Sequence, residues 1–137
     1  MISRRRGREF AMQLLYAVEV GKEAFAEALK GLSDDPELPQ DAREYGTQLA
    51  RKVLESQKDL DDRIAAAASN WDLDRIAIVD KLIIRCAVAE LMYMRDVPLK
   101  VAINEAVDIA KKYSTGDSSR FVNGVLDAIA KTFQNPD

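Results

Sequence analysis

Four of the first eight residues are arginines (Arg4, Arg5, Arg6 and Arg8), and no acidic residue precedes Glu9. The remaining 129 residues carry 16 basic against 23 acidic side chains. The net charge of −3 therefore combines a positively charged N-terminal segment with an otherwise acidic chain. The planar guanidinium group of arginine donates two parallel hydrogen bonds to a phosphate, which makes a short arginine cluster typical of a nucleic-acid contact. A solvated basic terminus without a ligand is the alternative interpretation.

Side chains that commonly carry catalysis are scarce in this sequence. It has no histidine, which removes the usual general base near neutral pH and the commonest metal ligand. Its single cysteine, Cys86, lies in an apolar stretch, which predicts a buried small residue rather than a nucleophile. The glycine-rich phosphate loops are missing, and the acidic clusters at residues 34–37 and 59–62 lack calcium-loop spacing. We therefore expect no enzyme activity, no metal and no cofactor.

Length and composition predict one folded domain over residues 1–137. A chain of this length with 47% apolar residues can bury roughly two-thirds of its unfolded surface. No apolar run approaches the roughly 20 residues that cross a bilayer, and Glu9, Gln13 and Glu19 interrupt the stretch that a secretory signal would need. A single cysteine forms no internal disulfide, which suits a reducing compartment. We expect a soluble, cytoplasmic protein.

The spacing of apolar residues predicts an all-α fold of about six or seven helices. The first is expected from Ser3 to about Val20, ended by Gly21, and a short second helix around residues 24–32. A long helical pattern follows to residue 68. Because a straight helix of 30 residues would measure about 45 Å, we expect a break near residues 56–59. Residues 73–94 are apolar on nearly every side, which predicts a central helix that is buried all round.

Two further helices complete the pattern. One has Pro98 in its first turn and an outward ion pair between Asp108 and Lys112, four residues apart. The last helix is capped by Asp117 or by the serine that follows it. Inside this helix, Gly124 predicts the close approach of another backbone, because a mid-helix glycine costs about 1 kcal/mol against alanine.

Several blocks of the sequence resemble the NusB family of bacterial transcription antitermination factors. In order they are residues 4–9 (RRRGRE), 14–16 (LLY), 80–85 (DKLIIR), 101–107 (VAINEAV), 110–113 (AKKY) and 121–127 (FVNGVLD). Residues 20–68 match by helical pattern and length only. One departure is Gly7, where the family more often has alanine. We expect this glycine to loosen the first helical turn and to leave the arginines partly ordered until RNA binds.

The resemblance implies a fold and a function. The fold is two three-helix bundles packed across each other. Members of the family pair with NusE, a protein of the small ribosomal subunit that doubles as an elongation factor. The pair binds the single-stranded boxA element of nascent RNA. Within the antitermination complex it helps RNA polymerase to read through terminators in ribosomal RNA operons.

The resemblance also implies the residues that make these contacts. For RNA they are Arg4, Arg5, Arg6, Arg8, Lys100, Asp117, Phe121 and Asn123, and for NusE they are Asp74 and Asp80. Single-stranded RNA is read by stacking on aromatic rings and by hydrogen bonds to polar side chains, which Phe121 and Asn123 supply near a helix N-terminus that favours phosphate. Without the resemblance, the alternatives are core packing for Phe121, a solvated lysine for Lys100 and a helix cap for Asp117.

Three other interpretations compete with this one. A NusB-like module also occurs in ribosomal RNA cytosine methyltransferases, but their Gly-rich cofactor site and nucleophilic cysteine have no counterpart here. A helical protein-interaction adaptor would leave the arginine run without a role. A DNA-binding helix-turn-helix protein would need a basic recognition helix, whereas the last helix carries only Arg120 and Lys131. The sequence is compatible with a monomer and with a homodimer that hides the RNA site.

Overall fold

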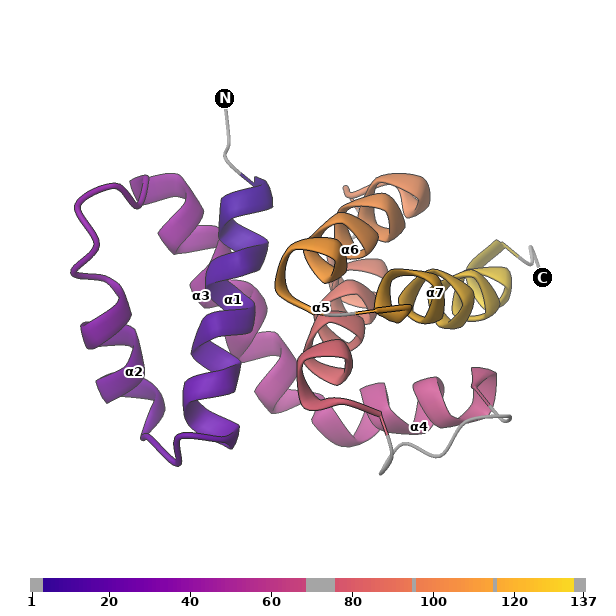
Figure 1. The fold of residues 1–137 in the computed structure, drawn as a ribbon, viewed down its shortest axis with the longest axis horizontal. Helices are drawn as coiled ribbons and strands as arrows, with labels where there is room; N and C mark the ends of the chain where they lie inside the picture. Colours follow the sequence, from indigo (N-terminus) through magenta and orange to yellow (C-terminus); the bar gives the residue numbers. More distant parts are fainter. Residues whose placement is uncertain (1–3, 69–75, 95, 115, 135–137) are drawn as a thin grey trace.

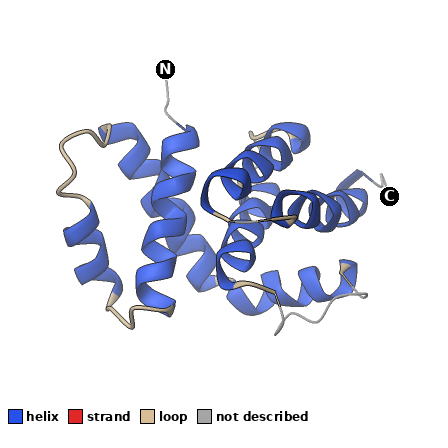
Figure 2. Cartoon of the chain, viewed as in Figure 1, coloured by secondary structure: helices blue, strands red, loops and turns tan. Residues whose placement is uncertain are grey.

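Seven α-helices and no strand make up the part of the chain that the computed structural model describes, which is residues 4–68, 76–94, 96–114 and 116–134 (Figures 1 and 2). In chain order they are α1 (Arg4–Glu19), α2 (Phe25–Leu32), α3 (Gln40–Glu55), α4 (Gln57–Ala67), α5 (Ile78–Tyr93), α6 (Leu99–Tyr113) and α7 (Ser118–Gln134). The predicted all-α fold is confirmed. None of these helices is both long and apolar enough to cross a membrane.

Most helix boundaries fall where the sequence signals predict them. Only Ser56 separates α3 from α4, which confirms the expected break in the long helical pattern. Pro98 precedes the first turn of α6 in an extended conformation rather than lying inside it. The predicted start of the central helix at residue 73 is wrong, because α5 begins at Ile78 and the described residues just before it are not helical.

The first bundle consists of α1, α2 and α3, and two glycines let α1 and α3 approach closely. A Cβ atom on Gly46 would lie 2.5 Å from the carbonyl oxygen of Gly7, and a Cβ atom on Gly7 would lie 3.1 Å from the carbonyl oxygen of Ala42. The expectation that Gly7 loosens the first turn is therefore wrong, since it lies buried within α1 against α3. The prediction for Gly124 is also wrong, because this glycine is exposed and an added Cβ atom would meet nothing.

The second bundle consists of α5, α6 and α7, with α4 packed against α5 and α7 (Figure 1). The fold thus has the two predicted bundles and one additional helix. Helix α5 also contacts α1 and α3, so it lies between the bundles and joins them. Its residues are buried almost without interruption from Leu82 to Leu91, which confirms that the helix predicted to be apolar all round is the central one.

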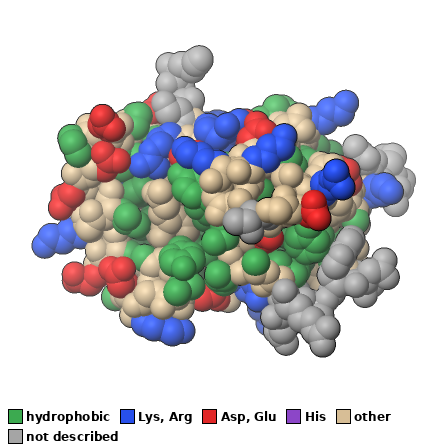
Figure 3. Space-filling model, viewed as in Figure 1, with side chains coloured by type: hydrophobic (Ala, Val, Ile, Leu, Met, Phe, Trp, Pro, Cys, Tyr) green, Lys and Arg blue, Asp and Glu red, His purple; other side chains and the backbone are tan. Residues whose placement is uncertain are grey.

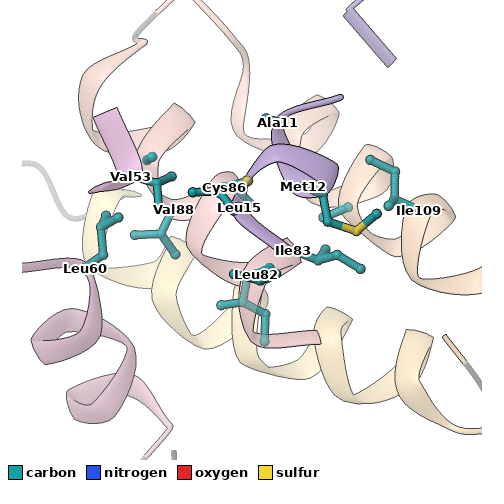
Figure 4. Close-up of a cluster of buried hydrophobic side chains, with 14 of the residues drawn as sticks. Ala11, Met12, Leu15, Val53, Leu60, Leu82, Ile83, Cys86, Val88 and Ile109 are labelled. Atoms are coloured by element: carbon teal, nitrogen blue, oxygen red, sulfur yellow. The ribbon is translucent and has the colours of Figure 1, made fainter. Parts of the chain in front are cut away.

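One hydrophobic core extends through both bundles. Met12 of α1, Leu82 and Ile83 of α5 and Ile109 of α6 all belong to it (Figure 4). Cys86 lies in the same cluster, and burial raises the pKa of its thiol. This position agrees with the prediction of a small buried residue.

Candidate nucleic-acid interface

The four N-terminal arginines occupy the first two turns of α1, but they point toward different parts of the molecule. The Nη2 atom of Arg4 lies 2.7 Å from Asp96, in the turn before α6, and its guanidinium carbon lies 5.0 Å from the ring centre of Tyr45. Arg6 points toward the loop between α2 and α3, where its Nη2 atom lies 3.3 Å from Asp35. The four arginines therefore do not form one free positive patch, since Arg4 and Arg6 already form ion pairs with carboxylates.

Arg5 meets two acids of α6. Its Nε atom donates to Oε1 of Glu105 at 2.8 Å, and its Nη2 atom donates both to Oε2 of Glu105 and to Oδ2 of Asp108, the latter at 2.9 Å. The hydrogen bond to Glu105 raises the pKa of Arg5, and the same bond lowers the pKa of Glu105. Both groups therefore stay charged, and Arg5 keeps its positive charge at the surface.

Arg8 lies in the core, where it connects four helices. Its side chain is 5% exposed and its Nε atom donates to both carboxylate oxygens of Glu90 on α5, at 2.8 and 3.0 Å. Its Nη1 atom reaches Glu105 of α6 at 3.2 Å, and the hydroxyl of Tyr45 from α3 donates to Glu90. Burial raises the pKa of Tyr45, so this hydroxyl keeps its proton. The structure thus places Arg8 in an interhelical ion pair rather than at the exposed phosphate contact expected from the sequence.

Lysine and arginine side chains line the upper edge of the molecule over α1 and α6 (Figure 3). Lys100 is exposed in the first turn of α6. At the other end of that helix, Lys112 lies 3.1 Å from Glu9, so it pairs with α1 instead of forming the predicted pair with Asp108. Helix α6 therefore lies along the arginine-bearing face of α1 and leads from it to the start of α7.

The aromatic and amide side chains expected to read RNA lie at the start of α7. Phe121 is half-buried and packs against the core, so it has both a core contact and an exposed part. Asp117 is exposed just before the helix, one turn from Phe121. Asn123 is also exposed, but residues two apart on a helix point about 160° apart. The structure thus groups Asn123 with Arg120, and a ligand must cross the end of α7 to reach both sides.

Asp80 lies in the first turn of α5, and its position differs from that of an exposed interface acid. It is 5% exposed, and its Oδ2 atom accepts a hydrogen bond of 2.9 Å from the hydroxyl of Ser118. Ser114 donates to the same hydroxyl at 2.8 Å. Asp80 therefore attaches the start of α5 to the turn that begins α7. Asp74, the other acid expected at the NusE surface, lies outside the described residues.

An apolar groove beside Asp80 was not predicted from the sequence. It has a volume of about 520 Å³, and it lies between α1, α2, the start of α5 and the end of α6. Its lining includes the exposed side chains of Tyr16 and Val20 and the half-buried Val79 next to Asp80. The signal that could have found it is the row of Met12, Tyr16 and Val20, which are spaced four residues apart and so share one side of the helix.

The family model for NusB matches residues 5–131 of this chain. The chain belongs to the NusB family. The transcription antitermination protein NusB of Chloroherpeton thalassium is 49% identical in an alignment of 134 residues, and the match covers 93% of this chain but 61% of that longer protein. The NusB protein of Geobacter sulfurreducens is 42% identical over 133 residues, with 96% of each chain covered. The family resemblance seen in the sequence is thereby confirmed.

Solved structures of NusB proteins share the fold. The NusB of T. maritima matches this member of the family with a TM-score of 0.85 and 35% identity, over 96% of this chain and 93% of that one. A crystal structure of the antitermination factors NusB and NusE in complex with double-stranded RNA contains a chain that matches with a TM-score of 0.84 and 29% identity. That match covers 94% of this chain and 96% of the other.

Proposed function

We propose that this NusB-family protein is a transcription antitermination factor that binds RNA together with NusE. The observation that carries the proposal is the position of Arg5. Its charge is kept at the surface between α1 and α6, and α6 leads from there to the exposed edge of Phe121. The six residues of α6 from Asp108 to Tyr113 rise by about 7.5 Å along the helix axis, a distance that a short RNA covers easily.

We infer that the RNA is single-stranded and of the boxA type. An unpaired base can stack on the exposed part of Phe121, which a base inside a duplex cannot do. Arg4, Arg5, Arg6 and Lys100 then supply the phosphate contacts, and Asp117 and Asn123 the polar contacts near the start of α7. Because Arg8 is buried in its ion pair with Glu90, we assign it to holding α1 in place.

We propose that NusE binds at the groove beside Asp80. The groove is apolar and open to solvent, and exposed apolar patches of this kind mark protein interaction sites. Asp80 would act from beneath this surface, since its hydrogen bond from Ser118 fixes the start of α5. The similarity to a chain solved with NusE and RNA supports a partner of this kind for the fold.

The proposed activity is binding without catalysis, in the cytoplasm, where nascent ribosomal RNA is made. RNA polymerase in its antitermination complex would read through terminators because the bound pair recruits the nascent RNA. A homodimer of the free chain that covers α1 and α6 would compete with this RNA binding, and the dimer would dissociate when RNA and NusE are added.

A titration of a labelled boxA-type RNA tests the proposal. Fluorescence anisotropy measures the dissociation constant with and without NusE, and a scrambled single strand and a duplex of the same sequence serve as controls. We expect weak binding by the protein alone, much tighter binding with NusE, and a preference for the boxA single strand. Equal binding of the boxA and scrambled strands, or an affinity that NusE leaves unchanged, would contradict it.

A further inference from the structure

Glu105 and Asp108 lie one turn apart on α6 and both contact Arg5, but they do so differently. We propose that Glu105 positions Arg5 for an RNA phosphate, whereas Asp108 occupies the place on Arg5 that this phosphate takes. The inference rests on the proposed RNA-binding function and adds a built-in competitor to it. Two acids of the same charge on the same helix would then have opposite effects on RNA binding.

Glu105 is held from behind by the core. Its side chain is 21% exposed, and its Oε1 atom contacts both Arg5, at 2.8 Å, and the buried Arg8, at 3.2 Å. Arg8 is in turn fixed by Glu90, which is 1% exposed. A chain of ion pairs therefore connects the interior with Arg5. Because two nitrogens of Arg5 bind two oxygens of Glu105, the orientation of the guanidinium plane is defined as well as its position.

Asp108 has a weaker hold on the same guanidinium group. It accepts one hydrogen bond from Nη2 of Arg5, and its side chain is 46% exposed. Exposed ion pairs are weak because water and salt screen them. Lys112, which could hold Asp108 from the next turn, pairs with Glu9 instead. A phosphate offers several oxygens to arginine, so it can replace the carboxylate of Asp108 while the pair of Arg5 with Glu105 stays intact.

This arrangement predicts that neutralising Glu105 and neutralising Asp108 change the RNA affinity in opposite directions. If the acids acted only through their charge near RNA, neutralising either one would raise the affinity, because each repels phosphate. If Glu105 instead positions Arg5, its neutralisation lowers the affinity, whereas neutralisation of Asp108 raises it.

The test compares Asp108→Asn, Glu105→Gln and a matched control in the titration with NusE and boxA-type RNA. The control is Asp62→Asn on α4, which removes an equal charge from another exposed ion pair, with Lys58 at 2.9 Å. We expect Asp108→Asn to tighten binding roughly 1.5- to 5-fold, Glu105→Gln to weaken it about tenfold, and Asp62→Asn to leave it unchanged. Glu105→Asp, which keeps the charge but shortens the side chain, should weaken binding in a protein that still folds.

The same variants in an Arg5→Ala background separate positioning from a purely structural role. We expect the effects of both acids on RNA affinity to disappear there, because they act through Arg5. Shifts in the same direction for Asp108→Asn and Glu105→Gln, or effects that persist without Arg5, would overturn the inference and leave the proposed function standing. A parent protein that binds no RNA would overturn both.

Discussion

The side chain of Phe121 is compatible with both roles considered for it, core packing and the proposed stacking of an RNA base. It is half-buried and packs against the core, whereas its neighbour Val122 is fully buried. Part of the side chain therefore contributes to the core, and part of it reaches the surface. The buried part and the exposed part of the Phe121 side chain therefore have to be considered separately.

Phe121→Ala should reduce both stability and RNA binding, each by a moderate amount. A half-buried ring should cost less than the roughly 3–5 kcal/mol of a fully buried phenylalanine, and the lost stacking should cost about 1–3 kcal/mol of RNA affinity. Chemical denaturation and the RNA titration measure the two effects. Val122→Ala is the control, since it should lower stability alone. RNA affinity unchanged in a folded Phe121→Ala protein would show that no base stacks there.

Arg8 and Glu90 form an ion pair that is almost completely removed from water. We expect Arg8→Ala to lower the free energy of unfolding by about 3–5 kcal/mol, because it leaves a buried carboxylate without its partner. The double replacement Arg8→Met with Glu90→Leu should restore most of this loss, as neither of these two positions then buries a charge. Urea denaturation of the parent, the Arg8→Ala variant and the double variant measures the free energy of unfolding. An Arg8→Ala protein as stable as the parent would show that the ion pair between Arg8 and Glu90 is solvated.

At the scale of helices, the crossing of α1 over α3 depends on glycine. Gly46→Ala should destabilise the protein, because the new Cβ atom would lie 2.5 Å from the Gly7 carbonyl oxygen and the two helices would have to separate. Gly124→Ala should instead stabilise it by about 0.5–1 kcal/mol, since this helical glycine is exposed and has free space around it. Thermal melting compares the two. A higher melting temperature for both variants would show that the contact between α1 and α3 tolerates a Cβ atom at Gly46.

The groove between α1, α2, the start of α5 and the end of α6 is the proposed binding surface for NusE. Val20→Glu should weaken NusE binding, because it places a charge in an apolar surface where a partner would have to desolvate it. Leu54→Glu on α3 is the control, since Leu54 is similarly exposed but does not line the groove. Calorimetric titration with NusE measures both. Equal affinities for the two variants would place the partner on another surface.

At the scale of the whole molecule, the acids that pair with the arginines make stability depend on pH. The hydrogen bond from Arg5 lowers the pKa of Glu105 below its ordinary value of 4.5, and Arg4 does the same to Asp96, ordinarily 3.8. A lowered pKa in the folded state stabilises the protein above the ordinary value, and this stabilisation is lost as the pH falls through the lowered one.

We therefore expect the melting temperature to fall below about pH 4.5, as these carboxylates become protonated and release α1 from α6 and from the turn before it. Melting curves between neutral pH and pH 3 measure it. Glu105→Gln should flatten the acid side of the curve, because it removes one of the titrating groups. A parent protein whose stability is constant over this range would contradict the role of these pairs.

The helical architecture was predictable from the sequence alone. The apolar period along α1, the interruption at Ser56 and the apolar surface of α5 are local patterns, and each predicts an element that the structure contains. Helix formation depends on neighbouring residues within about one turn, so a single sequence carries this information. The half-buried position of Phe121 and the exposure of Lys100 and Asn123 agree with the same periodicity.

The pairing of charged and small residues depended on the tertiary structure. The sequence predicted Lys112 as the partner of Asp108, an exposed Arg8 and a close approach at Gly124. In the folded protein Asp108 meets Arg5, Arg8 meets Glu90, and the close approach is at Gly7 and Gly46. Helical periodicity determines which residues share a face, but the acids that meet Arg5 and Arg8 come from helices more than 80 residues away. Which helix that is depends on how the two bundles pack around α5.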